Sequence, residues 1–178
     1  MTHDDWTERL WKWAEDNGID DNVLPRNKKR LTKLTKLELL WNQLTEIPRE
    51  IGNLTGLTEL KIWRTKLTKL PKEVGNLTGL TKLSLSDNQL TEIPYEIGNL
   101  ASLTELNLDA NQLTDIPREI GNLASLTELR LGHNKLTKLP REISNLTKLT
   151  RLHFDYNKLT EIPKEIGNLA KLTALILG

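Results

Sequence analysis

Leucine and isoleucine recur along most of the chain at fixed positions of a 23-residue period. Six segments align without gaps and together cover residues 34–171; they start at Leu34, Leu57, Leu80, Leu103, Leu126 and Leu149. The third segment reads LTKLSLSDNQLTEIPYEIGNLAS, and the shared pattern is LTxLxLxxNxLTxIPxEIGNLxx. Repetition at one fixed period predicts a stack of similar units.

Each part of the repeat predicts a local structure. Leu83 and Leu85 alternate with polar residues, which is typical of a short strand with one buried face. Asn88 follows at a bend, where asparagine tolerates unusual backbone angles and bonds to nearby backbone groups. Pro94 then suits the first position of a short helix, because it lacks an N–H. Glu96 places a negative charge near the positive end of that helix.

A single repeat is too small to fold alone, because the aliphatic side chains that it buries do not offset the entropy of ordering 23 residues. Stacked copies share one core and pair their strands. The pattern therefore predicts a one-dimensional solenoid.

The sequence resembles the leucine-rich repeat family over residues 34–177. The family motif LxxLxLxxNxL occurs as LTKLELLWNQL, LTKLSLSDNQL, LTELNLDANQL, LTELRLGHNKL and LTRLHFDYNKL. The tail IPxEIGNLxxL resembles the intracellular Ras-group type, found in scaffold proteins such as Scribble and in many bacterial proteins. The resemblance implies an α/β fold. It also implies a right-handed, curved solenoid with a parallel β-sheet on the concave face and short helices or 3₁₀ turns on the convex face.

The second repeat departs from the motif, because Thr65 stands where the family has asparagine. We expect the threonine hydroxyl to replace part of the asparagine's bonding. The expected result is a local cost in stability without a break in the coil.

Residues 1–33 are predicted to form a helical cap followed by a degenerate repeat, because an open solenoid exposes its core at both ends. Asp4 or Asp5 can start a helix, and Gly18 can stop it. Trp6, Leu10 and Trp13 have the spacing of one helical face, so we expect them to belong to the core of the cap.

Residues 172–178 open a seventh repeat with no cap after it. An uncovered strand invites pairing with another chain. Three explanations are open: a fragment of a longer protein, a tail-to-tail dimer, or a tolerated open end. For the dimer, the expected contacts are Leu175, Ile176 and Leu177.

Composition narrows the functional classes. The 178 residues carry a net charge of +1 and no cysteine, and 37% are hydrophobic. Near-zero charge argues against nucleic acid or acidic membranes as the main partner. The basic run from Arg26 to Lys36 follows acidic residues and lacks an aromatic stacking set, so we interpret it as solvated surface. We expect no cofactor and no metal site.

Variable strand positions are the expected carriers of function, and two clusters stand out. The first comprises Leu40, Trp41, Trp63 and Arg64 on the first two strands, and exposed Trp and Arg are frequent anchors of binding hot spots. The alternative is that the amino-terminal cap buries them. The second cluster is a polar aromatic group on strands five and six: Arg130, His133, His153, Asp155 and Tyr156. Its alternative is an ordinary solvated face.

Catalysis is not expected. His133 and His153 are about 10 Å apart on adjacent strands, too far to share a zinc ion. Asp109 and Asp155 lie two strands apart, about 9–10 Å, near the carboxylate spacing of an inverting glycosidase, but no deep pocket is implied.

The resulting hypothesis is a non-catalytic scaffold that binds a protein partner through the concave face. The alternatives are a structural module that self-associates through its last strand and, more weakly, a carbohydrate or small-ligand binder. The lack of a signal-peptide pattern and of cysteine-containing caps favours the cytoplasm, with delivery from a bacterium into a host as an alternative.

Overall fold

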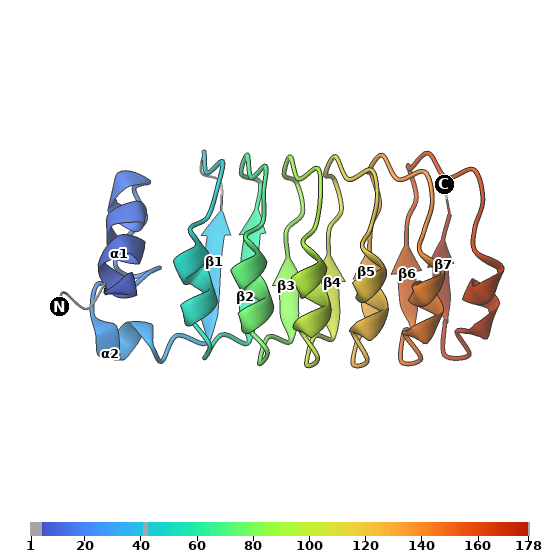
Figure 1. The fold of residues 1–178 in the computed structure, drawn as a ribbon. Helices are drawn as coiled ribbons and strands as arrows, with labels where there is room; N and C mark the ends of the chain where they lie inside the picture. The colour runs from blue at the N-terminus through green and yellow to red at the C-terminus, as the bar shows by residue number, and fades with distance from the viewer. Residues whose placement is uncertain (1–4, 41–42, 178) are drawn as a thin grey trace.

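A computed structural model of the protein describes residues 5–40 and 43–177. It contains one sheet of seven parallel strands in sequence order, which is open and has β1 and β7 at its two ends (Figure 1). The strands are β1 (Lys36–Leu40), β2 (Glu59–Trp63), β3 (Lys82–Ser84), β4 (Glu105–Asn107), β5 (Glu128–Arg130), β6 (Arg151–His153) and β7 (Ala174–Ile176). The predicted solenoid of parallel strands is thereby confirmed.

The 23-residue period sets the strand register. Leu37 pairs with Leu60, Leu60 with Leu83, and Leu83 with Leu106. Each strand therefore places residues of the same repeat position side by side. A row of one repeat position is consequently a continuous row in space.

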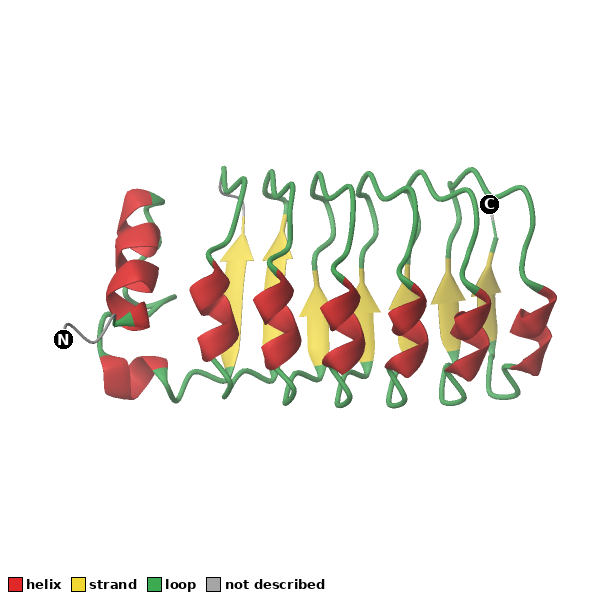
Figure 2. Ribbon diagram, in the orientation of Figure 1, coloured by secondary structure: helices red, strands yellow, loops and turns green. Residues whose placement is uncertain are grey.

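Six 3₁₀ helices form a second layer beside the sheet (Figure 2). They are η1 (Arg49–Asn53), η2 (Lys72–Asn76), η3 (Tyr95–Asn99), η4 (Arg118–Asn122), η5 (Arg141–Asn145) and η6 (Lys164–Asn168). The prediction for Pro94 is wrong by one position, because Pro94 is the residue before η3. Its ψ of 144° is extended, and its carbonyl accepts the first helical hydrogen bond from Ile97.

Leucine and isoleucine side chains fill the space between the two layers. The core is continuous from Leu10 in the cap to Leu169 in the last complete repeat. Buried asparagines run along one edge of this core. The side-chain amide of Asn111 donates to the carbonyls of Leu85, Leu108 and Asp109, and thereby ties two repeats together.

The unusual backbone angle at the bend lies one residue earlier than predicted. Asp87, and not Asn88, has a positive φ of 55°. The same holds at the equivalent positions, which are Arg64, Ala110, His133 and Tyr156. The asparagine is instead buried, where its side chain replaces backbone hydrogen bonds that the bend leaves unmade.

The amino-terminal end of the stack is covered by α1 (Trp6–Asp16), followed by α2 (Lys28–Leu31). Asp5 caps α1 by accepting a hydrogen bond from the Thr7 amide, and Gly18 follows its end with φ of 65°. Of the predicted face, Leu10 is buried, and Trp6 and Trp13 are partly buried and pack against the core. Thr7 and Ala14 are buried as well.

An ion pair joins the cap to the first repeat. Arg9 Nε lies 2.6 Å from Glu50 Oε1, and Glu50 is buried. Burial raises the pKa of Glu50, but hydrogen bonds from Arg9 and the Glu50 amide outweigh this effect, so the pKa lies below its ordinary value. The charge of Glu50 is therefore stabilised where α1 meets η1.

No helix in the described part of the chain is both long and apolar enough to cross a bilayer.

Candidate binding face

The side chains at the third, fifth and seventh positions of each strand segment point away from the core and form what we call the sheet face. In β1 the burial alternates, with Leu37 and Leu39 buried and Lys36 and Glu38 exposed. The family resemblance predicts that this face is concave. Because the register is uniform, the third- and fifth-position residues form rows that run from β1 to β7, and the described seventh-position residues form a row from Leu40 to Asp155.

The third-position row is made of ion pairs between neighbouring strands. Lys36 Nζ lies 2.9 Å from Glu59, Lys82 Nζ lies 2.8 Å from Glu105, and Arg151 lies 2.5 Å from Glu128. Each pair joins two residues that are 23 positions apart. The row therefore neutralises itself instead of presenting a field of one sign.

Glu59 is the most strongly perturbed group of the face. Its carboxylate accepts hydrogen bonds from Lys61 at 2.6 Å and from Lys36 at 2.9 Å, which lower its pKa to about 2. Lys61 also contacts Glu38 at 3.0 Å, and its own pKa is raised by Glu59 and Glu38. Strands β1 and β2 are thus linked by a network of four charges.

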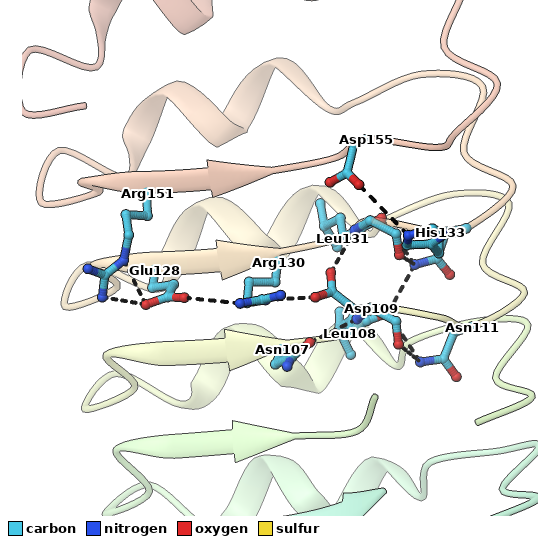
Figure 3. Close-up of polar contacts among 12 residues, drawn as sticks. Asn107, Leu108, Asp109, Asn111, Glu128, Arg130, Leu131, His133, Arg151 and Asp155 are labelled. Carbon is cyan, nitrogen blue, oxygen red and sulfur yellow. Dashed lines mark hydrogen bonds and ion pairs between the residues drawn. The ribbon is translucent and has the colours of Figure 1, made fainter. Parts of the chain in front are cut away.

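A second network crosses β4, β5 and β6 (Figure 3). Arg130 Nε lies 2.6 Å from Asp109 Oδ2, and the Arg130 guanidinium also lies 3.9 Å from Glu128, which pairs with Arg151. The other oxygen of Asp109 accepts a hydrogen bond of 2.8 Å from the Gly132 amide. Asp109 is therefore engaged on both oxygens.

Gly132 leaves a gap in the seventh-position row. A Cβ atom at this residue would lie 2.9 Å from Asp155 Oδ1 and 3.3 Å from Asp109 Oδ1. Asp109 and Asp155, whose predicted spacing resembles that of a glycosidase pair, thus place their carboxylates on either side of the space that a Gly132 side chain would occupy. Asp109 contacts Arg130 and the Gly132 amide, and Asp155 lies 3.9 Å from His133 Nε2.

The first predicted cluster lies at the ends of β1 and β2. The guanidinium of Arg64 stacks over the Trp63 ring at 5.0 Å from its centroid. Arg64 is exposed, whereas Trp63 and Leu40 are half-buried. Trp41 lies outside the described residues. Trp63 thus retains solvent exposure next to a cation, which is the arrangement that the hot-spot hypothesis requires.

The structure brings together only part of the second predicted cluster. His133 stacks on Tyr156 with ring centroids 4.3 Å apart, and His133 Nε2 lies 3.9 Å from Asp155. Tyr156 is 68% exposed. Arg130, in contrast, is drawn into the ion pair with Asp109, and His153 is its partner in the strand register.

The sequence analysis did not predict that the third-position residues of neighbouring strands form ion pairs on the sheet face. The signal was present, because Lys36 and Glu59, or Glu128 and Arg151, carry opposite charges at a separation of 23 residues. Any such pair at one repeat position becomes a neighbouring pair in a parallel, in-register sheet. The pairing of Arg130 with Asp109 carries no such signal, since these residues occupy different repeat positions.

The hollow of the sheet face is shallow and polar. It has a volume of about 220 Å³ and is floored by Ser84 and Asn107 between the longer side chains of Lys61 and Arg130. Typical small-molecule sites have volumes of about 300–1,000 Å³. In the described part of the chain, no three His, Cys, Asp or Glu side chains are grouped so that they could hold a metal ion.

The carboxyl-terminal edge carries a different kind of surface. Leu175, Ile176 and Leu177 are 40%, 43% and 51% exposed, and Ile162 beside them is 42% exposed. A cleft of about 390 Å³ lies between Ile162 and Leu177, with Phe154 and Leu159 in its wall. This edge is the most apolar exposed region among the described residues.

A protein-family model described as a leucine-rich repeat region matches residues 17–112 and 106–177. No curated protein sequence matches the chain. Solved structures are similar. One is the leucine-rich repeat ectodomain of the plant receptor kinase GASSHO1/SCHENGEN3 from Arabidopsis thaliana, solved in complex with CASPARIAN STRIP INTEGRITY FACTOR 2. It is 44% identical, with a TM-score of 0.77, over 83% of this chain and 19% of the ectodomain chain.

Two bacterial structures are also similar. The functional domain of InlJ from Listeria monocytogenes is 32% identical, with a TM-score of 0.73, over 85% of this chain and 31% of that one. A leucine-rich repeat protein of Leptospira interrogans is 34% identical, with a TM-score of 0.58, over 87% of this chain and 51% of that one. The chain thus spans at most about half the length of these three structures.

Proposed function

The chain belongs to the leucine-rich repeat family, and on that premise we propose that it is a non-catalytic scaffold that binds a protein partner through the sheet face. In this proposal residues 34–171 are the binding repeats, residues 1–33 are the cap, and residues 172–178 begin a further repeat. The complex of the GASSHO1/SCHENGEN3 ectodomain with CASPARIAN STRIP INTEGRITY FACTOR 2 supports a binding role for this fold.

The observation that carries the proposal is the pair formed by Trp63 and Arg64. Trp63 is a half-buried aromatic residue on a face whose charges otherwise neutralise one another. Nothing in the repeat motif calls for tryptophan at this position. Tryptophan and arginine are enriched among residues that dominate binding energy. We therefore assign Leu40, Trp41, Trp63 and Arg64 as the anchor, and the group around His133, Asp155 and Tyr156 as a secondary contact.

The mechanism is rigid presentation. The ion pairs of Glu59 with Lys36 and Lys61, and of Arg130 with Asp109, hold long side chains in one arrangement before a partner arrives. Binding of a partner then costs less conformational entropy, because these side chains are already ordered. Because the face is self-neutralised, we expect the apolar anchor to contribute more to affinity than long-range charge attraction.

The test is affinity capture of a partner followed by measurement of its Kd for two matched variants. Trp63→Ala removes the proposed anchor, whereas Tyr95→Ala removes a 64% exposed aromatic side chain from η3 in the other layer. We expect Trp63→Ala to raise the Kd by at least about tenfold and Tyr95→Ala to leave it unchanged. An unaltered Kd for Trp63→Ala with an intact circular dichroism spectrum would refute the anchor.

Self-association through β7 is a second candidate function, motivated by the exposure of Leu175, Ile176 and Leu177. Sedimentation analysis would decide it. We expect Ile176→Lys to abolish a dimer, because it places a charge on the apolar edge, whereas Lys171→Glu nearby would leave a dimer intact. A monomer at high concentration of the unaltered chain would exclude this function.

A further inference from the structure

We propose that a cationic cleft beside the amino-terminal end of the sheet binds an acidic segment of a protein partner. The cleft lies between α2 and the beginning of β1 and has a volume of about 580 Å³. Four cations line it, which are Lys29, Arg30, Lys33 and Lys36. Sequence reasoning interpreted this basic run as solvated surface, because acidic residues precede it in the chain.

The acidic residues of the cap do not neutralise the cleft. Asp21 accepts a hydrogen bond from the Arg26 amide and pairs with Arg30 at 3.2 Å, while Asp16 is occupied by Lys12. The engagement of Asp21 with the Arg26 amide and with Arg30 lowers its pKa, so it stays ionised. The carboxylate of Asp21 therefore neutralises the charge of Arg30 alone, and it pairs with none of the lysines of the cleft.

Two of the four cations have no acidic partner within the described part of the chain. Lys28 pairs with Asp5, and Lys36 pairs with Glu59, but no ion pair holds Lys29 or Lys33. Both residues are exposed. The cleft consequently has an excess of about two positive charges, in contrast to the balanced rows of the sheet face.

The walls of the cleft determine which kind of anion fits. Pro25 and the half-buried Leu34 provide apolar surface, and Asn22 and Thr35 provide hydrogen-bonding groups. A peptide segment with carboxylates flanking an apolar side chain satisfies both features. Among the described residues, no aromatic side chain lines the cleft for stacking on nucleotide bases.

Lys36 connects the cleft to the sheet face, because it belongs both to the cleft and to the third-position row. A single partner can therefore contact both surfaces. The proposal is nevertheless independent of the Trp63 anchor, since the cleft is built by residues of the cap and of the first strand alone. Loss of one surface is distinguishable from loss of the other by separate variants.

The experiment uses the full chain and a fluorescein-labelled hexaglutamate peptide with leucine at its centre as the probe. Fluorescence anisotropy at low salt gives the Kd, and amide chemical shifts locate the site. We expect shifts at residues 29–36 and a Kd that rises at least about tenfold in K29E/K33E. K29A/K33A should give a smaller rise, because it removes charge without adding repulsion. K164E/K171E makes the same charge change at the other end of the stack and should leave the Kd within about twofold.

Three results would overturn the proposal. The first is equal weakening by K29E/K33E and K164E/K171E, which would indicate a general charge effect. The second is the absence of amide shifts at residues 29–36 at saturating peptide. The third is tighter binding of a single-stranded oligonucleotide or of phosphatidylserine vesicles, assayed in the same buffer, than of the peptide. Thermal unfolding of each variant verifies that the fold is intact.

Discussion

The hydroxyl group of Thr65 donates a 2.5 Å hydrogen bond to Oδ1 of Asn88 in the following repeat. Both side chains are buried. The hydroxyl oxygen of Thr65 also accepts a hydrogen bond from the Leu67 amide. Asn88 itself donates to the carbonyls of Ile62, Leu85 and Ser86, whereas the single hydroxyl hydrogen of Thr65 is used on Asn88.

Restoring asparagine at position 65 should stabilise the protein. We expect Thr65→Asn to raise the free energy of unfolding by about 1 kcal/mol, because its amide can donate to backbone carbonyls of the first two repeats as Asn88 does. Chemical denaturation measures the change. The reciprocal variant Asn111→Thr should lower the stability by about 1–3 kcal/mol, since it leaves buried carbonyls without donors. Equal stability of both variants and the unaltered protein would contradict this account.

Glycine in the 3₁₀ helices allows neighbouring repeats to approach closely. A Cβ atom on Gly98 would lie 2.6 Å from the Glu119 carbonyl oxygen, which is backbone and cannot rotate away. We expect Gly98→Ala to lower the free energy of unfolding by about 1–3 kcal/mol. Gly79→Ala is the matched control, because its nearest neighbour is an ordinary contact at 3.8 Å.

The fifth repeat bears on the size of this effect, since Ser144 stands at the position equivalent to Gly98 and donates a hydrogen bond to the Arg141 carbonyl. A side chain is thus accommodated there, and we expect Gly98→Ala to reduce stability without abolishing the fold. A loss no greater for Gly98→Ala than for Gly79→Ala would show that the repeats separate at little cost.

Ala110 should be improved by glycine, because its φ of 54° is strained for a residue with a Cβ atom. We expect Ala110→Gly to stabilise the protein by about 0.5–1 kcal/mol, the relief of strain exceeding the entropy that glycine loses. Ala101→Gly, at an exposed alanine whose φ is not positive, should be neutral or destabilising. Thermal unfolding midpoints separate the two outcomes, and a lower midpoint for Ala110→Gly would be evidence against strain.

Glu59 should make stability depend on pH. Its pKa falls from 4.5 to about 2 on folding, because Lys61 and Lys36 donate to its carboxylate. A lowered pKa means that the folded chain binds the proton less tightly than the unfolded chain. The stabilisation is therefore present above about pH 4.5 and is lost as the pH falls towards 2.

The contribution of Glu59 is of the order of 1–2 kcal/mol after allowance for solvent screening of the exposed lysine partners. We expect urea unfolding to show Glu59→Gln as less stable than the unaltered protein at pH 7, with the difference shrinking below about pH 4.5. Glu46→Gln, which alters an exposed glutamate with no ion pair among the described residues, is the control. A difference that stays constant between pH 7 and 3 would exclude this role.

The repeat length and its apolar positions determined most of the architecture from the sequence alone. A period of 23 residues places Leu37, Leu60 and Leu83 in register, because equal spacing gives equal coils and equal coils stack. The same spacing made the pairs Lys36–Glu59 and Glu128–Arg151 predictable in principle. These features depend only on the spacing of residues along the chain, which can be read directly from the sequence.

Other features were decided only by the tertiary structure. Arg130 binds Asp109 on one neighbouring strand, and that choice depends on the gap left by Gly132 and on side-chain rotamers, which repeat positions do not encode. Two features lie where the irregular cap meets the first repeat: the ion pair of Arg9 with Glu50 and the cleft around Lys29 and Lys33. Periodicity ends at that junction, so contacts between residues distant in sequence depend on how α1 and α2 settle against the stack.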